Sequence, residues 1–343
     1  MTNKSYHIGN FDVACQFGVN ISAWLSHQRE QSVFIISDEN IFSSYPNLFA
    51  NHPFYILKSG ETIKNQDSIN DIVSLMLDQQ IDRNILIVGL GGGVITDIAG
   101  FVSSIYKRGT RLVLIPTSLL CMVDASLGGK NGINAGLRKN MIGTIHQPEQ
   151  ILFDYSLLIS LPGCEWKSGM AEVIKHAITL DTDLMRMLEE NDLKSLTDSE
   201  LLIDSLVKKN VDVKMKVVSS DPHDNSNRHV LNFGHTLGHA LEPILGLSHG
   251  EAISVGMVFA CKLSEKICGF NSEHTRRLTA LLHRYGLPVH VKAAVGKVLD
   301  LMVNDKKNKD SQITYVLLED MGKPIVHGFT KDQLIEPLTS FLS

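Results

Sequence analysis

Residues 84–97, Asn84-Ile-Leu-Ile-Val-Gly-Leu-Gly-Gly-Gly-Val-Ile-Thr-Asp97, join an apolar run to a cluster of glycines and then to a helical pattern. The apolar part, residues 84–88, predicts a buried strand. The glycines after it allow the backbone to approach a phosphate closely, and a following helix offers its free N–H groups to that phosphate. The spacing differs from Gly-x-Gly-x-x-Gly, so a phosphate-binding turn and a plain strand-to-helix turn both fit.

Similar apolar runs lie on both sides of this stretch. Residues 32–37 and 111–115 predict further strands, and residues 68–77 between them carry helical spacing. Strands that alternate with helices predict a mostly parallel, Rossmann-like sheet with helices on its faces.

The pattern changes near Leu161-Pro162, where long amphipathic stretches replace the strand-like runs up to about residue 285. Residues 312–318 predict one short strand, followed by a turn. We therefore expect an α/β domain over residues 1–160 and an all-α domain over residues 161–343.

Composition excludes several classes of protein. With 343 residues, 43% of them hydrophobic, the chain can bury a large core, and its net charge of −5 argues against nucleic-acid or anionic-membrane partners. The five cysteines are odd in number and none has Cys-x-x-Cys spacing, so neither a disulfide framework nor a zinc ribbon is expected. No apolar run reaches the ~20 residues that span a bilayer, and no secretory signal pattern is present. We expect a soluble cytoplasmic protein.

Histidines and a carboxylate suggest a metal site. His235 and His239 are four residues apart and so share one helical face, His249 follows ten residues later, and Glu172 lies upstream in another helical pattern. Such ligands suit a zinc ion with one position left for a substrate. Spacing alone favours His235 and His239 as the metal pair. Glu251 has a structural interpretation, because Ser248 and Glu251 form the Ser-x-x-Glu pattern of a helix capping box.

Basic side chains beside glycine or asparagine suit an anionic small molecule, although each one taken alone is better explained as a solvated surface charge. These are Lys107, Arg108, Lys130, Lys139, Lys175, Lys214 and Arg228. Asp38, after the first predicted strand, fits a ribose contact or, more simply, a helix cap. The polar turn around Glu61 and Lys64 is equally ambiguous.

Taken in order, seven segments resemble the 3-dehydroquinate synthase family. They are Gly91-Gly-Gly-Val-Ile-Thr-Asp-Ile-Ala-Gly-Phe101, Pro116-Thr-Ser-Leu-Leu120, Val123-Asp-Ala-Ser-Leu-Gly-Gly-Lys130, Lys139-Asn-Met-Ile-Gly143, Gly169-Met-Ala-Glu-Val-Ile-Lys175, Leu231-Asn-Phe-Gly-His-Thr-Leu-Gly-His239 and His249-Gly-Glu-Ala252. Weaker agreement covers nearly the whole chain.

The resemblance implies an N-terminal NAD-binding domain, a helical metal- and substrate-binding domain, and a homodimer. It implies Glu172, His235 and His249 as ligands of zinc, or of cobalt, in place of the pair that spacing favours. NAD contacts are expected at Asp38, Glu61, Lys64, Gly92, Gly93, Asp97, Thr117, Ser118, Lys130 and Lys139. Catalytic or substrate contacts are expected at Asp124, Lys130, Asn140, Lys175, Lys214, Arg228, Asn232, His239 and Lys306 or Lys307, with Arg108 reaching the partner's site.

The implied reaction, a step of the shikimate pathway to aromatic amino acids, converts 3-deoxy-D-arabino-heptulosonate 7-phosphate to 3-dehydroquinate and phosphate. It combines transient oxidation by NAD, phosphate elimination, re-reduction, and ring opening with aldol closure. Asn131 in place of a common threonine, His176 in place of a common tyrosine, and residues 221–228 depart from the family pattern. A related cyclase of secondary metabolism with another sugar phosphate is one alternative. Others are a dehydrogenase of the glycerol dehydrogenase type and a non-catalytic binding protein.

Overall fold

The computed structural model describes residues 2–28, 32–136, 138–224, 227–303 and 312–343. The chain forms two compact units. The first contains Met1–Pro162 and Val218–His223, and the second contains Gly163–Val217 and Asp224–Ser343. Lys306 and Lys307 lie outside the described residues.

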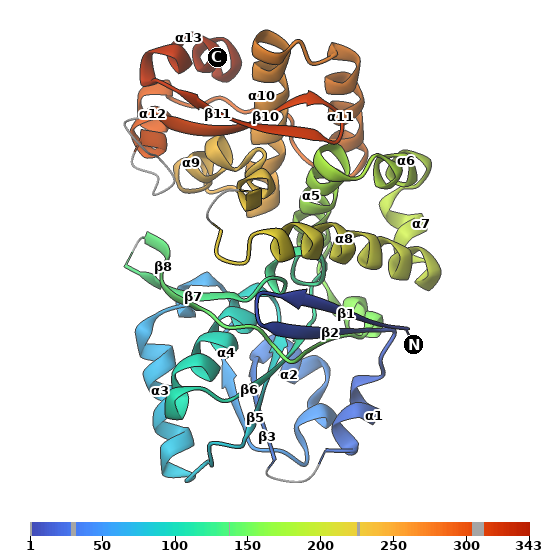
Figure 1. The fold of residues 1–343 in the computed structure, drawn as a ribbon, viewed down its shortest axis with the longest axis vertical. Coiled ribbons are helices and arrows are strands. Elements are labelled where there is room, and N and C mark those ends of the chain that lie inside the picture. Colours follow the sequence, from blue (N-terminus) through green and yellow to red (C-terminus); the bar gives the residue numbers. More distant parts are fainter. Residues whose placement is uncertain (1, 29–31, 137, 225–226, 304–311) are drawn as a thin grey trace. The chain divides into compact units, whose positions relative to one another are not determined.

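The first unit is built on a seven-stranded sheet (Figure 1). Its strand order is β1-β2-β9-β6-β5-β3-β4, and all neighbouring pairs are parallel except β1 and β2. The bounds are β1 Thr2–Ile8, β2 Phe11–Phe17, β3 Val33–Asp38, β4 Phe54–Leu57, β5 Leu86–Gly91, β6 Arg111–Pro116 and β9 Gln150–Phe153. The mostly parallel sheet and its three predicted strands, now β3, β5 and β6, are confirmed.

Helices and a second small sheet complete the first unit. The helix predicted over residues 68–77 is confirmed as α3 Gln66–Asp78. The other elements are α1 Ile21–Ser26, α2 Glu39–Ser44, α4 Gly93–Ile105, β7 Lys130–Ala135 and β8 Arg138–Ile145. Strands β7 and β8 pair antiparallel. Buried aliphatic residues of the central strands form the core with α1 and α2, among them Val33, Ile35, Val88, Val113 and Ile115.

The glycine cluster after residue 88 divides into two parts. Gly89 and Gly91 belong to β5, and a Cβ at Gly89 would lie 2.7 Å from Cβ of Ala99 on α4. These two glycines therefore allow α4 to pack closely on the sheet. Gly92 caps α4 and Gly93 is its first residue. Only these last two glycines stand at the helix end, where backbone N–H groups are free to meet a ligand.

The second unit is helical, as predicted. Its helices are α5 Gly163–Leu180, α6 Thr182–Glu190, α7 Leu193–Thr197, α8 Glu200–Ser220, α9 His235–Leu245, α10 His249–Cys268, α11 Ser272–Arg284, α12 Val295–Val303 and α13 Lys331–Leu342. The predicted strand at residues 312–318 is confirmed as β10 Ile313–Asp320, which pairs antiparallel with β11 Lys323–Phe329. An all-α description omits this pair.

Two further predictions concern the chain as a whole. All five cysteines are free, and three of them are buried: Cys15, Cys121 and Cys261. Within the described ranges, none of the helices has both the length and the apolar character needed to cross a bilayer.

Candidate metal centre

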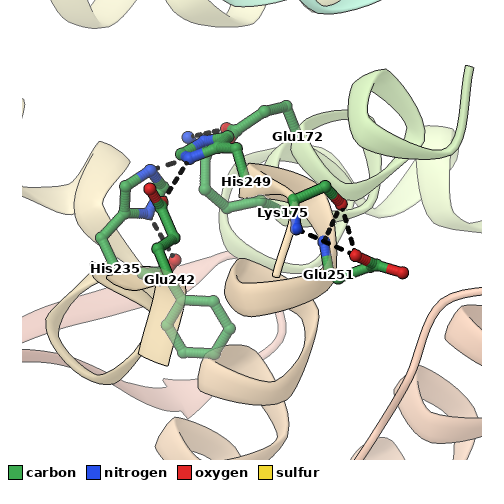
Figure 2. A network of polar contacts seen from close by, with 8 residues as sticks. Glu172, Lys175, His235, Glu242, His249 and Glu251 are labelled. Atoms are coloured by element: carbon green, nitrogen blue, oxygen red, sulfur yellow. Dashed lines mark hydrogen bonds and ion pairs between the residues drawn. The ribbon is translucent and has the colours of Figure 1, made fainter. Parts of the chain in front are cut away.

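Three potential metal ligands converge in the second unit (Figure 2). Glu172 lies in the middle of α5 and is fully buried, whereas His235 and His249 are the first residues of α9 and α10. Nε2 of His249 lies 3.1 Å from Oε1 of Glu172, and Nε2 of His235 lies 3.4 Å from the same oxygen. Both imidazoles therefore present the same ring nitrogen to one carboxylate oxygen.

Small residues allow the three helices to come this close. A Cβ on Gly250, the residue after His249, would lie 2.4 Å from Cα of Ser168 on α5. A Cβ on Gly256 of α10 would lie 1.9 Å from the carbonyl oxygen of Gly234, the N-cap of α9. Because only glycine fits at these contacts, the sequence around the ligands also sets the distance between the helices that carry them.

The far nitrogen of each histidine is held by an acceptor. Nδ1 of His235 donates to the carbonyl oxygen of Phe233 at 3.1 Å, and Nδ1 of His249 donates to Oε1 of Glu242 at 2.9 Å. A carbonyl oxygen can only accept, so the Nδ1 of His235 carries the proton and a neutral ring keeps a lone pair on Nε2.

Burial and neighbouring charges determine which groups are ionised. Burial opposes ionisation of Glu172, but the charge of Lys175 and the hydrogen bond from His249 outweigh it and hold the pKa of Glu172 well below its usual value. Burial lowers the pKa of His235 to about 3. Burial also acts to lower the pKa of His249, but its hydrogen bonds to Glu172 and Glu242 outweigh that effect and raise the pKa to about 9. The centre thus pairs a neutral imidazole with a carboxylate anion.

This arrangement fits a divalent metal ion. Neutral His235 directs the lone pair of Nε2 at an oxygen of ionised Glu172, so two hydrogen-bond acceptors face each other. A cation between such a pair of acceptors stabilises both. One carboxylate and two imidazoles, with ligand atoms all within 4.8 Å of one another, form a donor set suited to zinc.

His239 lies beside this group. Its ring centroid is 5.1 Å from that of His235 and 6.3 Å from that of His249, and its side chain is exposed. The ligand atom of His239 groups with those of Glu242 and His249, whereas His235 groups with Glu172 and His249. His235 and His239, the pair favoured by spacing alone, therefore fall in different candidate ligand groups, and His249 belongs to both groups.

Glu242 is a functional candidate that sequence reasoning missed. It is buried on α9, and its carboxylate accepts from His249. His235, His239 and Glu242 follow the spacing i, i+4, i+7 on one helical face. That spacing is the signal that could have found it.

Other expected residues of the second unit are also buried. Lys175 is 1% exposed and forms an ion pair with Glu172 one turn earlier on α5. Lys214 on α8 and Arg228 in the short helix Asn227–Asn232 are buried, and Asn232 ends that helix. Buried basic side chains of this kind need anionic or polar partners.

One polar network in the first unit connects several expected residues. Lys64 is buried, forms an ion pair with Asp97 on α4, and donates to Oδ1 of Asn140 at 2.6 Å. The backbone N–H of Asn140, a residue with φ of +54°, donates to Oδ1 of Asn134, whose own amide donates to Glu61 at 2.8 Å. Residues expected to meet the nucleotide and one expected to meet the substrate thus hold one another in place.

The ends of β5 and β6 bring together another expected set. The N–H of Thr117 donates to the carbonyl oxygen of Gly91 at 3.0 Å, and the side chain of Ser118 approaches Gly92. With Gly93, these residues lie at the carboxyl edge of adjacent parallel strands, where α/β sheets commonly bind nucleotides.

Asp38 is the last residue of β3 and caps helix α2. Its carboxylate accepts from the N–H groups of Asn40 at 2.9 Å and Ile41 at 3.1 Å. The helix-cap interpretation is confirmed. Burial raises the pKa of Asp38, although these backbone hydrogen bonds oppose the rise.

The remaining expected residues of the first unit lie on β7, on β8 and in two short helical turns. Lys130 begins β7 and is exposed, as is Lys139 on β8, and Asp124 is half-buried in the π-helical turn Cys121–Ala125. Arg108 is exposed and has φ of +66°.

Two departures from the family pattern have internal roles. The amide of Asn131 donates to the carbonyl oxygens of Gly129 at 2.7 Å and His146 at 2.9 Å, and its oxygen packs against Gly100. His176 is buried and its Nδ1 hydrogen-bonds with Oδ1 of Asn210 at 3.0 Å, which links α5 to α8.

Two family models match the chain in succession. The 3-dehydroquinate synthase N-terminal model covers residues 54–168, and the C-terminal model covers residues 169–308. A curated 3-dehydroquinate synthase from Prochlorococcus marinus (strain AS9601) is 34% identical over an alignment of 346 positions that covers 95% of each chain.

Two solved structures show the same fold. 2-Deoxy-scyllo-inosose synthase, complexed with carbaglucose-6-phosphate, NAD+ and Co2+, has a TM-score of 0.88 at 23% identity, covering 99% of this chain and 100% of that chain. 2-epi-5-epi-Valiolone synthase from Streptomyces hygroscopicus subsp. jinggangensis 5008, with NAD+ and Zn2+ bound, has a TM-score of 0.85 at 23% identity and covers 99% of both chains.

Proposed function

Because the chain belongs to the 3-dehydroquinate synthase family, we propose that it converts 3-deoxy-D-arabino-heptulosonate 7-phosphate to 3-dehydroquinate and phosphate. This reaction makes it a carbon–oxygen lyase of the shikimate pathway. The observation that carries the proposal is the convergence of Glu172, His235 and His249 in a chain of this family. One carboxylate and two imidazoles form a donor set that suits a catalytic zinc ion.

NAD and zinc, with cobalt as a substitute, are the proposed cofactors. When bound, they supply reversible hydride acceptance and Lewis acidity, so no second redox substrate is needed. The second unit would hold the metal through Glu172, His235 and His249. The first unit would hold NAD at the carboxyl ends of β5 and β6, through Gly92, Gly93, Asp97, Thr117 and Ser118.

The side chains of the second unit have separate proposed roles. Lys175 keeps Glu172 ionised, since it forms an ion pair with that carboxylate inside the protein. His239 is exposed next to the two histidine ligands, where an imidazole nitrogen can take up and return a proton. Lys214, Arg228 and Asn232 bind the anionic and hydroxyl groups of the substrate.

The side chains of the first unit divide between cofactor and substrate. Lys64 is positioned by Asp97 and Asn140, and with Glu61 it belongs to the proposed NAD contacts. Asp38, Lys130 and Lys139 are further proposed NAD contacts. For the substrate, we assign Asn140, Asp124 and Lys130 from the family motifs that contain them.

We also propose a cytoplasmic homodimer in which Arg108 reaches the partner's site. The net charge of −5 disfavours nucleic acid or anionic membrane as a partner. Measurement of molar mass by light scattering tests the dimer.

The deciding experiment measures phosphate release with NAD and zinc from 3-deoxy-D-arabino-heptulosonate 7-phosphate and, in parallel, from sedoheptulose 7-phosphate. Release from the first substrate alone, without net NADH, is the expected result. Release from the second alone would assign a secondary-metabolic cyclase, and net NADH without phosphate would assign a dehydrogenase. Glu172→Gln is expected to abolish release, whereas Glu251→Gln, a matched change at a helix cap, is expected to retain it.

A further inference from the structure

The two histidines of the candidate metal centre differ in what holds their far nitrogen. Phe233 offers His235 a neutral carbonyl oxygen, whereas Glu242 offers His249 a carboxylate. The side chain of His249 is also the more exposed of the two, at 32% against 11% for His235. The charged partner, Glu242, therefore contacts His249, which is the more exposed of the two histidines.

The position of Glu242 makes it a rigid support. Glu242 is 8% exposed and lies two turns along α9, the helix that begins with His235. Its contact with His249 connects the end of α9 to the start of α10. One helix thus supplies one ligand directly and holds the other in place (Figure 2).

We propose that Glu242 is a positioning residue for the metal, which fixes the ring orientation and tautomer of His249 through the Nδ1 hydrogen bond. This inference rests on the proposed function only in that the centre binds a divalent metal. A carboxylate that accepts from Nδ1 leaves Nε2 as the metal-binding nitrogen and makes that nitrogen a better donor. Nε2 is the atom that faces Glu172.

Geometry separates this role from direct ligation. Glu242 contacts Nδ1 of His249 and Glu172 contacts Nε2, so the two carboxylates lie at opposite nitrogens of one ring. A metal ion that bound Nε2 of His249 would leave the hydrogen bond from Nδ1 to Glu242 in place. Glu242 acts on such an ion through His249.

The matched test compares Glu242→Gln with Glu251→Gln. Both variants replace a glutamate by its amide near His249, but Glu251 hydrogen-bonds Ser248 in the capping box of α10. Zinc affinity is measured by competition with a chromophoric chelator at fixed pH. We expect Glu242→Gln to lose about 10- to 100-fold in affinity, the usual effect of removing such a support, and Glu251→Gln to stay close to wild type. Equal affinities of the two variants would overturn the proposal.

A double-mutant cycle distinguishes positioning from a general effect on the fold. In a His249→Ala background, Glu242→Gln has no imidazole to support, so it is expected to cause no further loss of zinc affinity. Additive losses would show that Glu242 acts by another route and would overturn the proposal.

A measurement on the wild-type protein covers the case in which the variants fail to fold. Two-bond 15N–1H correlation spectra of the zinc-loaded protein are expected to show His249 protonated at Nδ1, and the opposite tautomer would overturn the proposal. These readouts are independent of the reaction. If Glu242→Gln lowers zinc affinity but the wild-type protein releases no phosphate, the proposed function alone is refuted. If the wild type releases phosphate and Glu242→Gln binds zinc with unchanged affinity, the positioning role alone is refuted.

Discussion

Lys175 and Glu172 form an ion pair one turn apart on α5, and neither side chain is more than 2% exposed. A buried pair of this kind is costly to break, because removing one partner leaves the other charge without water or counter-ion. The same carboxylate faces both histidines of the candidate metal centre. Lys175 therefore supports the centre when no metal is bound.

Replacing Lys175 by Met is expected to lower the free energy of unfolding of the metal-free protein by about 3 kcal/mol, the lower end of the range for broken buried pairs. Saturation with zinc is expected to recover part of this loss, because a bound cation compensates Glu172. Urea unfolding with and without zinc measures both effects. Lys208→Met is the control, since Lys208 forms a more exposed ion pair with Asp204 on α8. A loss no larger than that of the control would contradict the prediction.

Zinc affinity is expected to increase with pH between about 7 and 9. The pKa of His249 is raised to about 9, so in the metal-free protein this imidazole is protonated at neutral pH, and metal must displace that proton. His235, with a pKa of about 3, is already neutral and adds no dependence in this range. One displaced proton gives about a tenfold gain in affinity per pH unit, measured by chelator competition. A flat profile from pH 7 to 9 would exclude a raised pKa at His249.

In the metal-free protein, the contribution of His249 to the free energy of unfolding is expected to decrease as the pH rises, whereas zinc affinity increases. A pKa raised from its unfolded value of about 6.5 contributes stability that is complete below pH 6.5 and is lost as the pH rises through about 9. The difference in unfolding free energy between wild type and His249→Gln is therefore expected to shrink over that interval. A difference that grows with pH in this comparison would contradict the prediction.

Gly256→Ala is expected to separate α9 from α10. The new Cβ would lie 1.9 Å from the carbonyl oxygen of Gly234, and backbone cannot move aside as a flexible side chain can. We expect a loss of about 1–3 kcal/mol in stability, as for other overpacked sites, together with weaker zinc binding. Gly296→Ala, at an exposed position of α12, is the control, because a Cβ there has no neighbour within 4 Å. Thermal unfolding measures the loss of stability and zinc titration measures the loss of affinity in both variants. Equal values for the two variants would contradict the prediction.

Lys64→Met is expected to weaken NAD binding at least about tenfold, by removing a charge-assisted hydrogen-bond donor. It also leaves Asp97 and Asn140 without their contact to the ammonium group. Isothermal titration with NAD measures the effect. Lys58→Met, a change at an exposed lysine six residues earlier, serves as the control and is expected to bind as wild type does. Equal affinities of the two variants would remove Lys64 from the NAD contacts.

The parts of the fold that were predictable have strong local patterns. Residues 85–88 are continuously apolar because β5 is buried on both faces. Ser248 with Glu251 carries a capping signal that depends only on neighbouring residues. Strand β8 had no such signal, because nearly all of its side chains are exposed. Strands β1 and β2 are polar on their outer face, and their pairing depends on a turn with Gly9 at φ of +59°.

Less of the candidate site than of the fold could be predicted from the sequence. Spacing along one helix favoured His235 and His239, but convergence depends on how α5, α9 and α10 pack, which local periodicity does not contain. The family motifs indicated Glu172 and His249 because the members of the family share the packing of these helices. Glu242 was missed since its role appears only once α10 places His249 against it.

The ligands of the candidate centre are far apart along the chain. Glu172 and His249 are separated by 77 residues, and the segment between them contains α6, α7, α8 and α9. A metal ion bound to both would act as a reversible cross-link that closes this segment into a loop and reduces the entropy of the unfolded chain. The supply of metal in the cell would then govern how long the protein survives proteases, as well as whether it is active.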